Sequence, residues 1–270
     1  MSMTRVRTFL AGSVALAAAL ALAAALPVAA QEGPAPQMIL VHQETVEPAM
    51  LEQYVQTSKD FFALVTANRE TMPTFQVEAF QTDEYEFVYA MPLANFAQMD
   101  VLMGEFMAME ASGNEEWQQA MQAGAGTTRQ FDEYVVVYRT DLSYQPAEPR
   151  IKPEEIAAYR WDFYYLKSDK AQDAEALAKD VAALYREKGI QDGYAIFQAV
   201  LGADLPYLVV STPGKSVADI ESRLAENAAK LGDAWGPIQQ RINEVTRSYT
   251  SKYAWARPDL SLAAPAAEGE

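Results

Sequence analysis

The chain has 270 residues, of which 50% are hydrophobic and 21% are charged, and its 37 acidic and 21 basic residues give a formal net charge of −16. This composition is that of a globular protein and excludes a disordered chain or a fibre. The absence of cysteine excludes disulfides, thiolate nucleophiles and cysteine-ligated metal sites, and the single histidine, His42, excludes a multi-histidine metal site within one subunit.

The first thirty residues have the pattern of a secretory signal peptide. An apolar run from about Thr8 to Leu26 follows two arginines, and small residues up to Ala30 then precede a polar residue. We therefore predict a signal peptide at 1–30 and an exported protein, periplasmic or secreted; an uncleaved membrane anchor is the alternative. No later run reaches the roughly 18 apolar residues of a membrane helix, so no membrane partner is expected after cleavage.

The acidic surface limits the partners of the mature chain. Cleavage would remove two arginines and no acidic residue, so the net charge of −16 would become −18. Such a surface repels phosphate backbones and anionic lipids, and no nucleic-acid partner is expected. Solubility is the ordinary role of this charge, and an acidic docking patch is the alternative.

After a linker at 31–37, the first half of the chain alternates between strand and helix patterns. An apolar extended run is followed by a helix with one apolar face, and then by two alternating strands around a tight turn. A second helix, capped by Asn95, and a closing strand complete the set. The predicted elements are a strand at 38–46, a helix at 48–69, strands at 74–80 and 85–91, a helix at 95–109 and a strand at 134–139.

The second half of the chain repeats this order. Gly189 ends its first helix, and Ser216 begins a long second helix. The predicted elements are a strand at 160–167, a helix at 171–188, strands at 194–200 and 207–211, a helix at 216–245 and a strand at 252–257.

Sequence identities support a duplication. Residues 117–143 match residues 235–261 at a constant offset of 118, with eight identities. Both copies end in an Arg-x-Asp-Leu-Ser segment, which begins at Arg139 in the first and at Arg257 in the second. An Asp can fix a turn and an Arg can pair with it, so we expect these two exits to be structural rather than ligand clamps.

Each half has the order βαββαβ, which is typical of a ferredoxin-like unit with an antiparallel sheet and two helices on one face. The other face needs cover, because Trp161, Phe163 and Tyr165 are too apolar to stay exposed. We predict an α+β fold of two tandem ferredoxin-like units packed sheet to sheet, as a monomer with internal pseudo-twofold symmetry. The predicted boundaries are 38–145 and 159–262 for the units, 146–158 for a second linker and 263–270 for a disordered tail.

The chain resembles the dimeric α/β-barrel superfamily, which contains antibiotic-biosynthesis monooxygenase-like, NIPSNAP-like and EthD-like domains, here fused in tandem. The resemblance covers about residues 38–262 and rests on the element order, on the duplicated Trp117 and Trp235, and on the duplicated exits. Haem-binding branches of the superfamily hold iron through a His on or near a helix. His42 instead lies on a strand and the second copy has Phe163 at that place, so no cofactor is expected.

His42 and Glu44 are the candidate catalytic residues. They share one face of the first strand, about 7 Å apart along it, so Glu44 could hold the imidazole as a general base. A hydrogen-bonded structural His in a partly buried sheet is the alternative. No metal site is expected, because the residues have no recognised ligand spacing.

A ligand pocket is predicted between the two sheets. Alternation along the strands gathers aromatic and some polar side chains on shared faces, which suits a small apolar or aromatic ligand. Filling of the core by aromatic residues is the alternative. The candidate pocket residues are Gln76, Glu78, Tyr134, Tyr138, Trp161, Phe163 and Tyr165.

Three functions remain open. The first is an exported protein that binds a small apolar or aromatic ligand between the sheets. The second is a cofactor-independent monooxygenase-like or isomerase-like enzyme that uses His42 and Glu44. The third is an acidic module that docks a partner protein.

Overall fold

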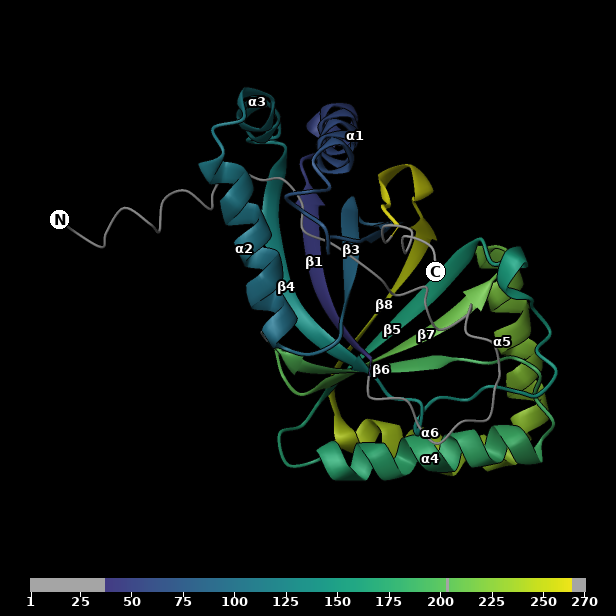
Figure 1. Cartoon of the computed structure of the whole chain (residues 1–270). Coiled ribbons are helices and arrows are strands. Elements are labelled where there is room, and N and C mark those ends of the chain that lie inside the picture. The colour runs from purple at the N-terminus through teal and green to yellow at the C-terminus, as the bar shows by residue number, and fades with distance from the viewer. Residues whose placement is uncertain (1–36, 203, 264–270) are drawn as a thin grey trace, which may run out of the picture. The chain divides into compact units, whose positions relative to one another are not determined.

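The computed structural model describes residues 37–202 and 204–263, which form a mixed α+β fold (Figure 1). The predicted signal peptide at 1–30, the linker up to residue 36 and the tail from residue 264 lie outside the described residues. In the described part of the chain, no helix has both the length and the apolar composition that a membrane span requires.

The described chain divides into two compact units. Unit 1 comprises Ile39–Glu133 together with the segment that starts at Arg257, and unit 2 comprises Met38 and Tyr134–Ala256. The second half of the last strand of the first copy therefore belongs to unit 2, and the residues after the last strand of the second copy belong to unit 1.

Unit 1 contains three neighbouring strands in the order β1-β3-β2. Strands β2 and β3 are antiparallel, with Glu78 opposite Ala90 and Gln81 opposite Phe87. The elements are β1 (Met38–Val46), α1 (Leu51–Ala67), β2 (Glu78–Thr82), β3 (Glu86–Leu93), α2 (Ala97–Ala111), α3 (Glu115–Ala123) and the start of β4 (Thr128–Tyr138).

Aromatic rings fill the core of unit 1. Phe61 on α1 is fully buried, and its ring centroid lies 5.4 Å from that of Trp117 on α3 and 6.3 Å from that of Phe75. Trp117 is 1% exposed, so this copy of the duplicated tryptophan anchors its helix in the core.

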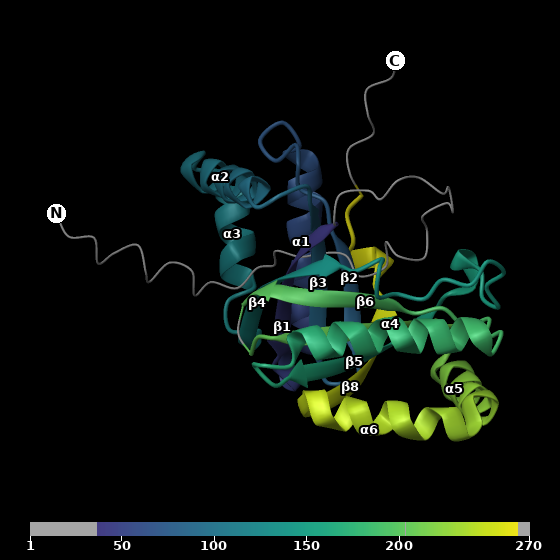
Figure 2. The ribbon, with the colours of Figure 1, turned by 90° about the horizontal axis from the view of Figure 1, so that it is seen from below.

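Unit 2 contains five neighbouring strands in the order β8-β5-β7-β6-β4. The pairs β5–β8, β5–β7, β6–β7 and β4–β6 are all antiparallel. Helices α4 and α6 lie side by side, as Figures 1 and 2 show. The elements are β5 (Ala158–Leu166), α4 (Ala171–Glu187), β6 (Ala195–Leu201), β7 (Tyr207–Gly214), α5 (Val217–Leu231), α6 (Trp235–Val245) and β8 (Thr246–Ala256).

The predicted long helix at 216–245 is wrong in one respect, because it is two helices. Gly232, with a φ of +52°, ends α5 in a conformation that favours glycine, and a 3-10 turn then leads into α6. Unit 1 has the same break, since Gly113 has a φ of +68° and the Asn114 side chain accepts a hydrogen bond from the Trp117 amide to cap α3.

The strand bounds also differ from the prediction. The closing strands are longer than expected, because β4 begins at Thr128 and β8 at Thr246. Strand β2 begins at Glu78 rather than at Thr74, whose amide and hydroxyl both bind Glu105 on α2 instead of a neighbouring strand. A side-chain partner thus replaces the ladder at the start of the predicted strand.

The two Arg-x-Asp-Leu-Ser exits make matching ion pairs. In unit 2, Arg139 binds Asp141 at 2.8 Å and Glu175 on α4 at 3.0 Å. In unit 1, Arg257 binds Asp259 at 2.9 Å, and its guanidinium donates to the side chain of Gln81 on β2 at 2.6 Å. These contacts are within the protein, which supports the structural role expected for the exits.

The serine of each exit connects the exit to a strand by hydrogen bonds. Ser143 Oγ accepts a hydrogen bond from the Ile196 amide at 2.8 Å and donates one to the Arg139 carbonyl. Ser261 Oγ does the same with the Ala79 amide at 2.9 Å and the Arg257 carbonyl.

Loss of either serine hydroxyl should therefore destabilise the protein. We expect Ser143→Ala and Ser261→Ala each to lower the free energy of unfolding by about 1 kcal/mol, because each leaves a backbone amide without its acceptor. The two effects should add, since the sites lie in different units. Urea denaturation measures this, with exposed Ser168→Ala as the control; equal midpoints for all three variants would contradict the expectation.

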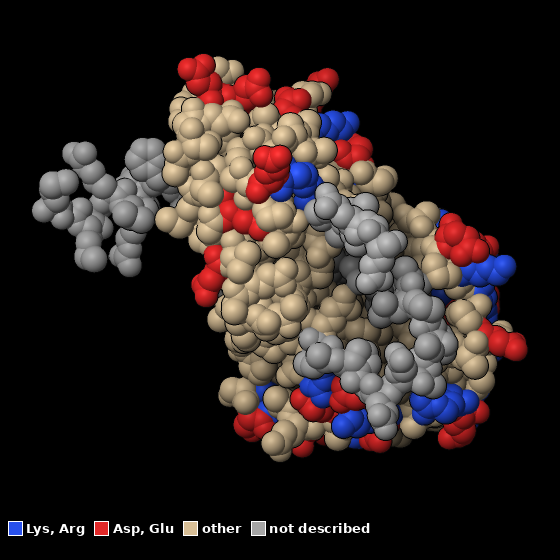
Figure 3. All heavy atoms as spheres, in the orientation of Figure 1, with Lys and Arg blue, Asp and Glu red and all other residues tan. Residues whose placement is uncertain are grey.

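Charged side chains on the face drawn in Figure 3 are scattered among uncharged ones. Lys and Arg side chains lie singly or beside Asp and Glu on this face. Among the ion pairs at the surface, Arg241 on α6 lies 2.7 Å from Asp180 on α4. Such exposed pairs contribute little to stability, so the helices depend on their buried faces.

Candidate functional site

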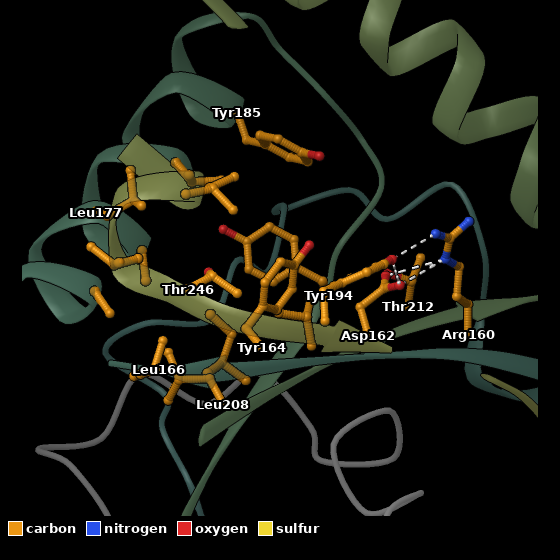
Figure 4. A pocket seen from close by; sticks show the side chains of 18 of the residues that line it. Arg160, Asp162, Tyr164, Leu166, Leu177, Tyr185, Tyr194, Leu208, Thr212 and Thr246 are labelled. Atoms are coloured by element: carbon orange, nitrogen blue, oxygen red, sulfur yellow. Dashed lines mark hydrogen bonds and ion pairs between the residues drawn. The ribbon is translucent and has the colours of Figure 1, made fainter. Parts of the chain in front are cut away.

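A cavity of about 260 Å³ lies in unit 2 between its sheet and the helices α4 and α6 (Figure 4). Strands β5 to β8 supply one wall, and the helices supply the other. The apolar lining consists of Leu166, Ala174, Leu177, Ala178, Val181, Ile196, Leu208, Val210, Leu224, Trp235, Ile242 and Val245, and the polar lining consists of Arg160, Asp162, Tyr164, Tyr185, Tyr194, Thr212, Thr246 and Tyr249.

At three positions that line the cavity, unit 2 has small side chains where unit 1 has rings. Helices α1 and α4 both have 17 residues and start at residues 51 and 171, so their positions pair at a spacing of 120. Strands β3 and β7 both have eight residues and start at 86 and 207, so they pair at a spacing of 121. Three buried rings of unit 1 thus correspond to smaller cavity-lining residues: Tyr54 to Ala174, Phe61 to Val181 and Tyr89 to Val210.

A cluster of charged groups closes one end of the cavity. Asp162 is only 8% exposed and accepts hydrogen bonds from Arg160 Nε at 3.0 Å and from the Tyr249 hydroxyl at 2.5 Å. Arg160 also binds Glu221 at 2.7 Å, and Tyr249 is 45% exposed, so this end borders solvent. With two carboxylates and one guanidinium, the cluster has a net negative charge that repels anions.

Hydroxyl groups are the other polar feature of the cavity. Burial raises the pKa of Tyr185 to about 12 and also raises the pKa of Tyr194, so both hydroxyls stay protonated at neutral pH and can donate hydrogen bonds. The Tyr194 hydroxyl and Thr246 Oγ1 are buried, and neither has a hydrogen-bond partner among the described residues.

The predicted catalytic pair lies in unit 1. His42 Nε2 lies 3.2 Å from Glu44 Oε1, and His42 Nδ1 lies 3.1 Å from Oε1 of Glu133 on β4. The His42 ring also stacks on Phe131, with centroids 5.7 Å apart. The structure thus brings His42 and Glu44 together, and it adds Glu133, which sequence reasoning missed because the closing strand was predicted to start only at residue 134.

Glu44 is part of a buried chain of hydrogen bonds that reaches α1. Glu44 is 1% exposed, and its Oε2 accepts a hydrogen bond from the Tyr54 hydroxyl at 2.5 Å. The Tyr54 hydroxyl also lies 2.6 Å from that of Tyr89 on β3. The pair therefore faces the helices of unit 1.

The pKa of His42 is raised to about 9. Burial alone would lower it, but the hydrogen bond to Glu133 and the adjacent carboxylates of Glu133 and Glu44 raise it further than burial lowers it. The hydrogen bond to His42 also lowers the pKa of Glu133. At neutral pH, His42 is a cation between two carboxylates, and a protonated imidazole cannot accept a proton as a general base.

The counterpart of His42 in the second copy is Asp162, so the prediction of Phe163 is wrong by one residue. Strands β1 and β5 both have nine residues and start at 38 and 158, which gives a spacing of 120. Successive side chains of a strand point to opposite faces, so this slip exchanges the two faces. The His42 cluster and the cavity thus occupy corresponding places in the two units.

Three of the predicted pocket residues gather around Tyr207 on β7. The ring centroids of Tyr134, Phe163 and Tyr165 lie 6.2, 6.5 and 5.3 Å from that of Tyr207. These rings lie on the sheet face opposite the cavity. The cavity is lined by the intervening residues of β5 and β7, such as Tyr164 and Leu208, whose side chains point to the other face.

The other four predicted pocket residues are divided between the units. Trp161 is 1% exposed, and the Tyr138 ring packs 5.4 Å from that of Phe197, both in unit 2. Gln76 and Glu78 are half-buried in unit 1. None of the seven predicted residues lines the cavity of unit 2, and the pocket between the sheets stays a prediction.

Among the described residues, the side chains that commonly bind metals do not form a group, and no histidine lines the cavity. No three His, Cys, Asp or Glu side chains in residues 37–202 and 204–263 form a group that could hold a metal ion. The sole histidine of the chain has both ring nitrogens against carboxylates in unit 1, and the cavity of unit 2 has no histidine to bind an iron.

Comparison with known proteins shows likeness of fold alone. No protein-family model matches the chain, and no curated protein matches it. An anthrone oxidase-like protein is similar in structure, with a TM-score of 0.51 and 10% identity over 82% of this chain and 91% of that one. This likeness supports an α+β fold of the dimeric α/β-barrel type.

Two further solved structures are similar at lower scores. A proposed monooxygenase of Lactobacillus acidophilus has a TM-score of 0.49 and 6% identity over 85% of this chain and 97% of that one. A chlorite dismutase variant of Candidatus Nitrospira defluvii has a TM-score of 0.49 and 9% identity over 82% of this chain and 92% of that one.

Proposed function

We propose that the protein binds a small apolar molecule in the cavity of unit 2. The mainly apolar lining of the cavity carries this proposal, because an apolar ligand that enters the cavity removes this lining from water. The apolar lining with a few polar groups at one end is typical of a small-molecule site.

Methyl NMR spectroscopy tests the proposal. We expect a two-ring hydrocarbon such as tetralin, titrated into the full chain with labelled Ile, Leu and Val methyl groups, to shift the signals of Leu177, Ile196 and Ile242 in unit 2. The signals of Ile39 and Leu102, which are buried in unit 1, serve as internal controls. Unchanged unit 2 signals up to the solubility limit of the probe would refute ligand binding in this cavity.

For the architecture, we propose two ferredoxin-like units packed sheet to sheet, with the boundaries predicted from the sequence. The matching element order of the two halves supports this, as does the fold likeness that extends over 82% of the chain. Export after cleavage at residue 30 is also a proposal, which rests on the pattern of the first thirty residues. N-terminal sequencing of the mature protein tests it, since cleavage exposes Gln31.

An enzyme that uses His42 and Glu44 is the second candidate. The contact of His42 with two carboxylates and, through Glu44, with Tyr54 favours it, because such groups could pass a proton along the chain of hydrogen bonds. The burial of the cluster and the charge of His42 at neutral pH favour a structural role instead. Turnover of a substrate that persists unchanged in a His42→Ala variant would dispose of this candidate.

A further inference from the structure

The Tyr194 hydroxyl is a buried donor without a partner among the described residues. The side chain lines the cavity and is only 7% exposed. Its ring is held by those of Tyr144 and Tyr185, with centroids 6.1 and 5.4 Å away. Because an unsatisfied buried donor costs free energy, this group requires an acceptor that the described residues do not supply.

The fold itself does not need this hydroxyl. Tyr194 forms an isolated β-bridge with Tyr144, just after the exit of the first copy. The corresponding bridge of unit 1 joins Val77 to Leu262, so an apolar residue serves the same structural position there. Only the unit that has the cavity therefore has a hydroxyl at this position of the bridge.

Size and charge limit what the cavity can hold. A cavity of about 150 Å³ accommodates benzene, so about 260 Å³ suits a skeleton of roughly two rings. The cluster of Arg160, Asp162 and Glu221 places a net negative charge at one end, which disfavours an anionic ligand. Thr246 adds a second hydroxyl without a partner on the cavity wall.

We propose that the ligand is a neutral apolar molecule of about two rings with one hydrogen-bond acceptor, such as a carbonyl oxygen, that accepts from the Tyr194 hydroxyl. This inference rests on the function proposed above. The acceptor satisfies the orphaned hydroxyl, and the skeleton contacts the apolar lining of the cavity.

The test uses three probes with one skeleton: tetralin, which has no polar group, 1-tetralone, which carries a carbonyl, and tetralin-1-carboxylate, which is an anion. Isothermal titration calorimetry on the full chain should give 1-tetralone a Kd about three- to tenfold lower than that of tetralin. The carboxylate should bind more weakly than either.

Two hydroxyl deletions and one control locate the effect. Tyr194→Phe should reduce the preference for 1-tetralone and leave the Kd of tetralin within about twofold, and adding Thr246→Val should remove what remains. Tyr144→Phe is the matched control, because the Tyr144 hydroxyl donates to the Ile190 carbonyl and does not line the cavity. This control should keep the preference.

The outcomes separate the two proposals. Equal affinities for tetralin and 1-tetralone, a preference that survives in the double variant, or tighter binding of the carboxylate would each overturn the proposed ligand class while cavity binding stands. Binding of none of the three probes would refute cavity binding, and the ligand class with it. Circular dichroism confirms that each variant is folded.

Discussion

Replacing Ala174 by phenylalanine is expected to lower the affinity of unit 2 for tetralin at least about 100-fold, which corresponds to about 2.7 kcal/mol. Ala174 is 4% exposed and lines the cavity, so a ring at this position occupies the space that the ligand needs. Unit 1 already has a ring at the corresponding position, which is Tyr54. The Tyr54 ring centroid lies 4.7 Å from that of Phe87, and the counterpart of Phe87 in unit 2 is Leu208, which lines the cavity.

The same substitution should stabilise the protein. Filling an apolar cavity adds buried surface without a new polar group, and we expect the free energy of unfolding to rise by about 1–2 kcal/mol. Exposed Ala176→Phe on the same helix is the control and should change neither quantity. Undiminished tetralin binding by a folded Ala174→Phe variant would show that the ligand lies elsewhere.

Raising the pH from about 6.5 to about 9 is expected to lower the free energy of unfolding by up to about 3 kcal/mol. The folded state binds the proton of His42 more tightly than the unfolded state does, since its pKa is about 9 rather than 6.5. This extra stability is fully present below pH 6.5 and is lost as the pH rises through 9. The figure is an upper bound, because the Glu133 side chain is 50% exposed and solvent screens its charge.

Urea denaturation at pH 6, 7.5 and 9 measures this loss. His42 is the only histidine of the chain, so a His42→Gln variant should be less stable at pH 6 and should have a nearly flat profile over this range. The loss at pH 6 follows because Glu44 would stay buried without a cation. An equal decline in the variant would mean that another group titrates.

The element order could be predicted because each copy repeats the same periodic patterns. Helices α1 and α4 both begin within three residues of the predicted positions, since their apolar faces and flanking residues are local signals. The breaks at Gly113 and Gly232 are harder to predict, because a glycine in a helical pattern does not always end the helix; here both glycines adopt a positive φ.

The cavity could not be predicted from one copy alone. A helix rich in alanine, such as α4, has the pattern of an ordinary amphipathic helix, and only a comparison with α1 shows that Ala174 and Val181 stand where α1 has rings. A pairing of the copies at a spacing of 120 along these helices would have been the signal. The sequence identities instead support a spacing of 118, because they lie after these helices and the lengths of the copies differ.

The face of the unit 2 sheet that borders the cavity is also hard to predict from the sequence. Aromatic residues such as Phe163 favour the prediction of a pocket, whereas Arg160 and Asp162 suggest a solvated face. In the structure these two charges bind each other on the cavity side. Pairing of charges is a tertiary feature, so alternation along β5 could not show which face holds a ligand.

The placement of the two exits has a consequence for fragments of the chain. The exit that starts at Arg139 ends the first copy but belongs to unit 2, and the exit that starts at Arg257 ends the second copy but belongs to unit 1. Each unit is therefore built from both copies. A fragment that is cut between the copies would contain neither unit in full, so the two halves of the sequence are not expected to be interchangeable with the two units.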